Sequence, residues 1–410
     1  MNNEQKLLLS LIRCFVSGEN IESQKNINFD ELFLEARRQS VFLMVAEVAL
    51  KNKEFLPKEF AVNIKKLAFT GLSRNNEIEN HQKNLVKILE GNNINYCIIK
   101  GTASASFYNK PQYRALGDVD FFVEENKKVD KVLQAEGYER FLEEHENHVV
   151  FKKGRVSLEM HHGIAGMPDG EKGKKISDFL ENLVYNVTEK KILNTTYNAP
   201  IDKNHGIIIL LHTAHHLPNE GLGLRHLLDW GFFIEEYSKT NECKDVFLPF
   251  LEEVKLLEFA KILTKTNEVY FGFSPKEFSK EVNKKLCEEL IEDILSAGNF
   301  GNKDKAYRYS GIMVTDNKNG LGESKIKTLL KVLDDTIYST YPIVKKYKIL
   351  YPFIFIWRFI RYFFLMLFGK RHNPKKLSNI AGKSRESKFP NWQIKTERVR
   401  AETSKIFEEE

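Results

Sequence analysis

Residues 96–123 read YCIIKGTASASFYNKPQYRALGDVDFFV and carry the pattern that decides the fold. Two short runs of apolar, β-prone residues, 95–99 and 118–123, are separated by a small-residue segment at 102–108 and a proline-containing loop. Short apolar runs bounded by glycine and proline are typical of strands, and a small-residue segment between them favours a helix. The stretch therefore predicts a strand, a helix and a second strand.

The second run contains two acidic residues, Asp118 and Asp120, which alternate with apolar residues. Side chains two apart on a strand point to the same face, so both carboxylates are expected side by side. Glu159 lies in a later β-rich run, where it alternates with Leu158 and Met160. Neighbouring carboxylates repel one another unless a cation lies between them, and Mg²⁺ favours such oxygen ligands. We therefore predict Asp118, Asp120 and Glu159 as catalytic carboxylates that bind two ions of Mg²⁺ or Mn²⁺.

The turn upstream of the aspartates has features of a phosphate-binding segment. Lys100, Gly101 and Thr102 lie where the first strand ends and the helix begins. Glycine lets a ligand approach the backbone closely, and the free N–H groups of a helix N-terminus suit an anion. Arg114 lies in the loop just before the aspartates, and its guanidinium can bind a phosphate in bidentate fashion. We expect these four residues to contact phosphate.

The pattern of the remaining chain is mainly helical. Apolar residues recur at helical spacing over 31–50, a long helix is expected over 57–89, and 205–300 is helical again, with an all-apolar run at 207–211 that should be buried. A β-hairpin with a glycine turn is expected over 148–160. Together these signals predict an α+β fold, in which a small mixed β-sheet is flanked by N-terminal and C-terminal helical regions. The expected parts are an N-terminal helical region (1–92), the sheet-containing core (93–200), a helical domain (201–300), a loop with C-terminal helices (301–370) and a charged tail (371–410).

The order of these motifs resembles that of the large, mostly uncharacterised nucleotidyltransferase family of the polymerase-β superfamily. In that family a Lys-Gly turn leads to Tyr, Pro and Arg, then to Asp-x-Asp, and a later strand carries the third carboxylate. The similar residues here are Ile98 to Tyr108, Pro111, Arg114, Asp118 to Val123, Leu158 to His161, His212 to His216, Leu224 to Trp230 and Tyr351 to Arg361. The resemblance thus covers about residues 30–370 and is most specific over 95–162.

This resemblance implies the metal-dependent transfer of a nucleoside monophosphate from a nucleoside triphosphate to an acceptor. It leaves the acceptor open but favours a sugar or glycan intermediate, because genes of the family often lie near those for surface polysaccharides. Many members of the superfamily have Gly-Ser at the turn, whereas this chain has Gly101-Thr102 and a longer gap to the aspartates. We expect Thr102, Ser104 or Arg114 to replace the phosphate contact of that serine.

Five further polar residues are candidates for substrate contact. His212 and His216 are one helical turn apart, as are Arg225 and Asp229, and His161 ends the strand of the third carboxylate. A metal shared by the histidine pair is disfavoured, because no acidic residue stands at the spacing that a zinc motif requires. Arg225 and Asp229 are expected to form an intrahelical ion pair or to contact substrate. His161 is expected to lie near the acceptor or to orient a carboxylate.

Composition limits the other classes of function. Four widely spaced cysteines without a C-x-x-C pair argue against a zinc ribbon or a disulfide framework. The net charge of +6, from 62 basic and 56 acidic residues, is too small to indicate a nucleic-acid partner by itself. The N-terminal segment lacks the pattern of a signal peptide, so a cytoplasmic protein is expected.

The most apolar stretch of the chain, 351–368, is near the lower length limit for crossing a bilayer. Arg358 and Arg361 lie at its middle, and each would cost about 2.5–3.5 kcal/mol there. We therefore predict no transmembrane span but a helix docked on the protein body, with peripheral contact with a membrane surface as the alternative. The tail after Gly369 is rich in charged residues and is expected to be a solvated helix or disordered.

Two other classes of function stay open. One is a nucleotide-binding protein without catalytic activity, against which the three intact carboxylates argue. The other is a helical interaction or RNA-processing module built on the helices after residue 205, where we find no nuclease-like pairing of Arg and His. Metal-dependent turnover would distinguish the enzyme from both.

Overall fold

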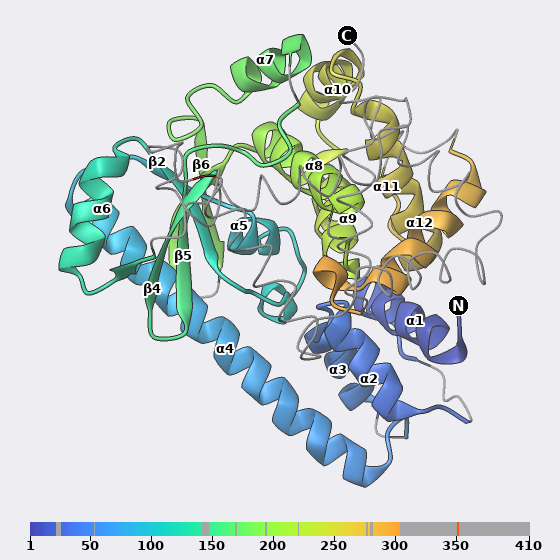
Figure 1. The fold of residues 1–410 in the computed structure, drawn as a ribbon. Coiled ribbons are helices and arrows are strands. Elements are labelled where there is room, and N and C mark those ends of the chain that lie inside the picture. Colours follow the sequence, from blue (N-terminus) through green and yellow to red (C-terminus); the bar gives the residue numbers. More distant parts are fainter. Residues whose placement is uncertain are drawn as a thin grey trace.

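The computed structural model describes residues 1–303, apart from 22–25, 53, 142–146, 169, 193–194, 220, 276–277 and 279–281, together with Tyr351. The predictions for the 351–368 stretch and for the charged tail lie outside the described residues. Within the described part, no helix has both the length and the apolar character that a bilayer crossing requires. Helices flank a five-stranded mixed sheet and a separate two-stranded hairpin, which confirms the predicted α+β class (Figure 1).

The chain begins with helices. They are α1 (Asn3–Ser17), α2 (Phe29–Arg38), α3 (Phe42–Lys51) and α4 (Lys58–Gly91). The long helix expected over 57–89 is confirmed by α4, whereas the helical pattern over 31–50 is divided between α2 and α3. The division falls at Ser40, whose φ of 57° lies in the left-handed region and ends a right-handed helix.

The sheet-forming segment follows. Its strands are β1 (Tyr96–Ile99), β2 (Val119–Val123), β3 (Glu139–Arg140), β4 (His148–Lys153) and β5 (Val156–His161), and its helices are α5 (Gly101–Ala105), η1 (Pro111–Tyr113) and α6 (Asn126–Ala135). The strand order is β1-β2-β5-β4-β3, and β2 and β5 are parallel while the other neighbouring pairs are antiparallel. The predicted hairpin is confirmed as β4 and β5, whose turn contains Gly154 with a φ of 62°.

A second set of elements completes the described chain. It comprises α7 (Gly170–Phe179), β6 (Val187–Ile192), β7 (Thr195–Pro200), α8 (Asp202–Asn219), α9 (Leu224–Tyr237), η2 (Cys243–Phe247), α10 (Leu248–Glu253), α11 (Leu257–Phe271), α12 (Lys284–Ala297) and η3 (Asn299–Gly301). The β6–β7 hairpin was not expected from the sequence, because β6 is mostly polar and only partly buried. The all-apolar run 207–211 in α8 is buried, as predicted.

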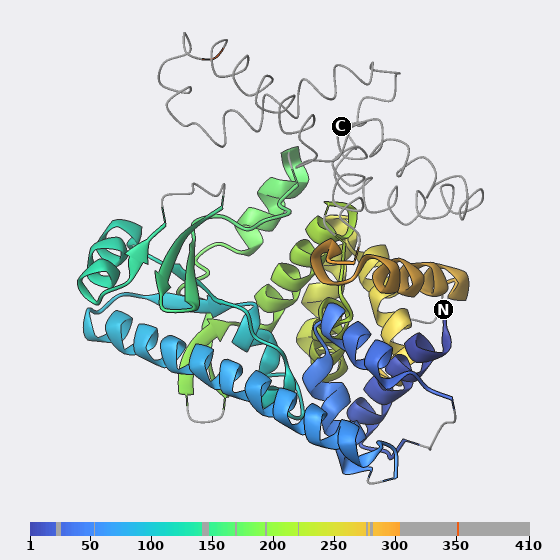
Figure 2. The same cartoon turned by 60° about the horizontal axis from the view of Figure 1, so that its bottom comes forward.

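Helix α4 connects two hydrophobic cores. Near its N-terminal end, Ile64 and Ala68 belong to the larger core formed by the N-terminal and C-terminal helices. Further along, Ile78, Leu85 and Leu89 belong to the core beneath the sheet. With 34 residues the helix is roughly 50 Å long, and Figure 2 shows it passing along the sheet and on to the N-terminal helices. The sheet and the helical body are therefore fixed to one rigid element.

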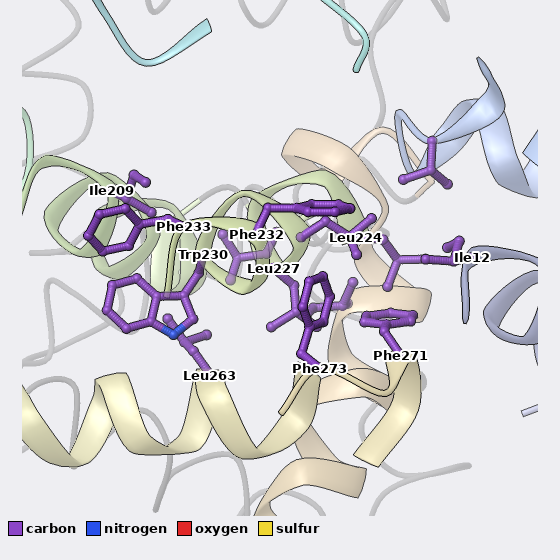
Figure 3. Close-up of a cluster of buried hydrophobic side chains, with 14 of the residues drawn as sticks. Ile12, Ile209, Leu224, Leu227, Trp230, Phe232, Phe233, Leu263, Phe271 and Phe273 are labelled. Carbon is purple, nitrogen blue, oxygen red and sulfur yellow. The ribbon is translucent and has the colours of Figure 1, made fainter. Parts of the chain in front are cut away.

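The larger core is centred on α9 (Figure 3). Leu227, Trp230 and Phe233 are fully buried, and the indole N–H of Trp230 donates to the Thr264 hydroxyl at 2.8 Å. At Gly206 on α8, a Cβ would lie 2.7 Å from the rings of Phe233 and Phe247, so only glycine allows this approach. Dense packing of this kind fixes α8 and α9 relative to each other.

His205 lies where α8 meets the segment between β1 and β2. Its ring is 1% exposed, stacks on Phe107 with ring centroids 5.1 Å apart, and has Nε2 3.5 Å from the Ser104 hydroxyl. Burial, assisted by the charge of Lys190, lowers the pKa of His205 to about 3. The folded protein therefore holds this imidazole in the neutral form.

We predict that His205 makes folding sensitive to acid. Below about pH 6.5 the unfolded chain binds a proton that the folded chain does not, so stability falls as the pH drops. Between pH 7.5 and pH 5.0 this loss should be about 2 kcal/mol, and His205→Gln should remove it. Urea unfolding at both pH values measures the effect, with His162→Gln, at an exposed imidazole, as the control. A difference between wild type and His205→Gln that stays the same at both pH values would contradict this account.

Candidate functional site

The two faces of the sheet differ in chemistry. Asp120 on β2 lies directly opposite Glu159 on the parallel strand β5, so both carboxylates share a face. Asp118 precedes β2 by one residue and lies two residues from Asp120, on the same side. Val119 and Phe121 alternate with them and are buried in the core that includes α4. The strand alternation thus gives one apolar face and one acidic face.

Lys100, at the end of β1, lies beside this acidic face. Its neighbour Ile99 pairs with Asp120, and its ammonium donates to Asp120 Oδ1 at 2.9 Å. Lys100 is also the residue of the Lys-Gly turn with left-handed geometry, at φ 51° and ψ −123°. Such a backbone costs energy for a residue with a side chain, and Lys100 adopts it while its ammonium contacts Asp120.

Two histidines from β4 and β5 border the carboxylates. His161 Nε2 lies 2.8 Å from Asp120 Oδ1, 3.4 Å from Lys100 Nζ and 3.8 Å from Glu159 Oε2. His148 faces His161 across the hairpin, and its Nε2 lies 3.6 Å from the same Glu159 oxygen. Asp120 is therefore held by two basic side chains, Lys100 and His161, and Glu159 lies between two imidazoles.

Burial and the closeness of the three carboxyl groups shift their pKa values. Burial alone would raise the pKa of Asp120, but Lys100 and the hydrogen bond with His161 hold it well below its usual range. Burial and the charge of Asp120 raise the pKa of Asp118 to about 6. Burial, then the charges of Asp120 and Asp118, raise the pKa of Glu159 to about 8, and its carboxyl is hydrogen-bonded to Asp118. At neutral pH, Glu159 therefore retains a proton that a divalent cation would displace.

These residues fit a divalent cation. Three carboxyl groups from adjacent strands converge on one face, and burial together with their mutual repulsion raises the pKa values of two of them. Oxygen donors of this kind are the ligands that Mg²⁺ and Mn²⁺ prefer. Asp118, Asp120 and Glu159 are the residues that could hold such ions, and their role as ligands stays a prediction.

Arg114, expected as a phosphate ligand, is bound to another residue. Its Nε and Nη2 donate to the two carboxylate oxygens of Asp229 on α9, each at 2.7 Å, and its side chain is 5% exposed. The Tyr108 hydroxyl donates to the same carboxylate at 2.7 Å. This bidentate pair joins the loop before β2 to the helical body. The geometry favours a positioning role for Arg114 over direct phosphate contact.

Arg225 lies one helical turn before Asp229 but does not form the ion pair with it that the spacing allows. Because Asp229 binds Arg114, Arg225 has no carboxylate partner among the described residues. Its Nη1 donates to the Ala115 carbonyl at 3.3 Å, and its guanidinium lies 6.0 Å from the Phe300 ring centroid. The side chain is half-buried and within electrostatic reach of Asp118.

The other predicted phosphate contacts lie in α5. The Thr102 hydroxyl donates to Gln82 Oε1 at 2.5 Å, and Ser104 contacts His205, so both buried hydroxyls have partners inside the protein. A Cβ at Gly101 would lie 3.6 Å from the Asp118 carbonyl oxygen, an ordinary contact distance. The structure therefore brings Lys100 to the carboxylates but directs the Thr102 and Ser104 hydroxyls elsewhere.

His212 and His216 of α8 pack against His226 of α9. The His212 and His216 ring centroids are 4.4 Å apart, and His226 lies 5.4 Å from His212. Burial holds the pKa values of His212 and His226 well below the usual range, so both rings are neutral. Phe300 contacts His216 and His226 edge-on. Ring packing therefore accounts for the positions of the two predicted histidines.

Two residues of this region were missed in the sequence. Tyr108 contacts Asp229 across 121 residues, a separation for which the sequence holds no signal. His148 could have been found, because the two-residue turn at 154–155 fixes the hairpin register and places it opposite His161.

We predict that Asp229→Asn destabilises the protein by about 3–5 kcal/mol, because it leaves the Arg114 charge buried and uncompensated. Urea unfolding measures the loss. Asp130→Asn is the matched control: Asp130 also binds an arginine, Arg140, at 2.9 Å, but at the surface, where the cost should stay below about 1 kcal/mol. Equal losses in the two variants would refute a structural role for the buried pair.

Comparison with known proteins identifies the family. No curated protein and no solved structure matches the chain. The sequence model of a family described as uncharacterised nucleotidyltransferase matches residues 25–272, more than half of the chain, and the matched range includes β1, β2, β5 and α9. The chain therefore belongs to the uncharacterised nucleotidyltransferase family.

Proposed function

We propose that the protein transfers a nucleoside monophosphate from a nucleoside triphosphate to an acceptor hydroxyl or phosphate, with Asp118, Asp120 and Glu159 as the catalytic carboxylates. The acceptor oxygen forms a bond to the α-phosphorus, the bond from that phosphorus to the bridging oxygen breaks, and pyrophosphate leaves with the electron pair. The proton of a hydroxyl acceptor passes to solvent. The observation that carries the proposal is the meeting of three carboxyl groups on one sheet face, two of them with raised pKa values.

Two divalent ions, Mg²⁺ or Mn²⁺, would supply activation of the attacking oxygen and stabilisation of the leaving pyrophosphate. The chain's own residues position the carboxylates for them. His161 and Lys100 fix the orientation of Asp120 through contacts of 2.8 and 2.9 Å. Val119 and Phe121 anchor the strand from the opposite face.

Two cations are suited to the triphosphate. Lys100 ends β1 next to the carboxylates, and its ammonium would turn from Asp120 to a phosphate once other positive charge balances that carboxylate. Arg225 has a half-buried guanidinium without a carboxylate partner in the described chain, and a planar guanidinium matches a phosphate well. Arg114 supports this arrangement by holding Asp229, which keeps Arg225 available.

For the acceptor we propose a sugar or glycan intermediate, which rests on the resemblance of the sequence and not on a contact in the fold. Incubation of the protein with a metabolite extract, labelled nucleoside triphosphates and Mg²⁺, followed by mass spectrometry of the products, would identify it. Labelling of a protein side chain or an RNA end, when the incubation is repeated with a whole-cell lysate, would replace the sugar proposal but keep the reaction.

We expect Asp118→Asn and Asp120→Asn each to lower nucleotidyl transfer by roughly 100-fold or more, because each removes a charge that positions cations in the transition state. Pyrophosphate release and label transfer measure the rate, and circular dichroism checks that the fold is kept. Asp245→Asn, at an exposed position in η2, is the control and should leave the rate unchanged. Near wild-type transfer by either aspartate variant would exclude these carboxylates from catalysis.

A further inference from the structure

His148, Glu159 and His161 form a cluster with a different chemistry from the aspartate pair. Their ligand atoms all lie within 4.8 Å of one another, and among the described residues they make up a group of His and Glu donors that could hold a metal ion. The two imidazoles come from opposite positions of the β4–β5 hairpin, and Glu159 lies two residues from His161 on the same face. The hairpin register alone therefore assembles the cluster.

We propose that His148, Glu159 and His161 bind a divalent transition-metal ion, for which Zn²⁺ is the probe. The inference deepens the proposed function, on which its catalytic meaning rests, since Glu159 is shared with the carboxylate site. Binding of the ion does not itself depend on nucleotidyl transfer.

The contacts with Glu159 are longer than hydrogen bonds, whereas His161 Nε2 is hydrogen-bonded to Asp120 Oδ1 at 2.8 Å. His148 Nε2 and His161 Nε2 lie 3.6 and 3.8 Å from Glu159 Oε2, beyond the usual hydrogen-bond range of about 2.7–3.2 Å. Ligand atoms that each lie about 2.0–2.1 Å from one tetrahedral ion are separated by roughly 3.4 Å. A small closing movement of the side chains, in which His161 Nε2 exchanges its contact with Asp120 for the ion, would bring all three atoms to an ion between them.

The donor set selects the class of ion. Mg²⁺ prefers oxygen ligands and keeps several waters, whereas imidazole nitrogen suits zinc and the other later transition metals. Two histidines and one carboxylate are a known ligand set for zinc sites that keep an open coordination position. The pair Asp118 and Asp120 offers only oxygen, so the two halves of the site differ in the ions they prefer.

The exposure of the side chains agrees with this assignment. The side chains of His148 and Glu159 are 20% and 21% exposed, so an ion can reach them from solvent, while His161 is 3% exposed and fixed in place. Glu159 is the carboxyl group between the two imidazoles. The ammonium of Lys100 is bonded to Asp120 Oδ1 and lies 3.4 Å from His161 Nε2, so it must move away from that nitrogen when an ion binds.

Isothermal titration calorimetry of the metal-stripped, full-length protein without nucleotide tests the site, with Zn²⁺ and Mg²⁺ titrated separately. We expect His148→Ala to weaken Zn²⁺ binding by at least about tenfold and to leave Mg²⁺ binding unchanged. His148→Gln provides a second variant of closer size. His162→Ala removes an exposed neighbouring imidazole and should alter neither affinity.

Asp118→Asn separates this proposal from the proposed function. It should weaken Mg²⁺ binding and leave the His148-dependent Zn²⁺ affinity in place. Equal Zn²⁺ affinity in wild type and both His148 variants, or equal losses in His148→Ala and His162→Ala, would overturn the metal site. Absence of nucleotidyl transfer together with His148-dependent Zn²⁺ binding would refute the proposed function and keep the site.

Discussion

Asp120 is buried and ionised, and it is hydrogen-bonded to two basic side chains, Lys100 and His161. It therefore holds a fixed negative charge inside the protein. Burial, together with that charge, raises the pKa of Asp118 to about 6 and of Glu159 to about 8. A protein keeps such a cluster only where something else compensates, because isolated buried charges are costly. Here Lys100 compensates in part, and the remaining negative charge is what makes the face suitable for divalent cations.

Geometry around Asp120 depends on both faces of β2. On the far side, Val119 and Phe121 pack into the core that α4 covers, so the strand cannot shift without exposing apolar surface. On the near side, the Arg114–Asp229 pair ties the loop before β2 to α9. Helix α4 extends from the sheet core into the helical core and so links the two (Figure 2). The acidic face therefore has rigid support from both parts of the chain.

Much of the site was accessible from local sequence pattern. Alternation in 118–123 predicts the shared face of the two aspartates, and the position of Glu159 on a later strand predicts its neighbourhood; the structure pairs Asp120 with Glu159 directly. Local pattern also gave the class of fold, the long helix α4 and the β4–β5 hairpin. In each case the signal lies within a few residues and follows from side-chain periodicity.

Contacts between residues far apart in the sequence could not be predicted. Arg225 and Asp229 have the spacing of an intrahelical pair, yet Asp229 binds Arg114, 115 residues away, since a buried bidentate contact is stronger. The residue of the turn with positive φ is Lys100 and not Gly101, and the side chain of Lys100 contacts Asp120, 20 residues away. The β6–β7 hairpin was missed because a mostly polar strand lacks the alternation that marks a buried one.

The central claim is that Asp118, Asp120 and Glu159 form one cation-binding site, and proton release on Mg²⁺ binding tests it most directly. Calorimetry at pH 7.0 in buffers of different ionisation enthalpy counts the protons. With the pKa of Glu159 at about 8, the account predicts that about one proton leaves as Mg²⁺ binds and that Glu159→Gln abolishes this release. Mg²⁺ binding without proton release, or release that persists in Glu159→Gln, would contradict it.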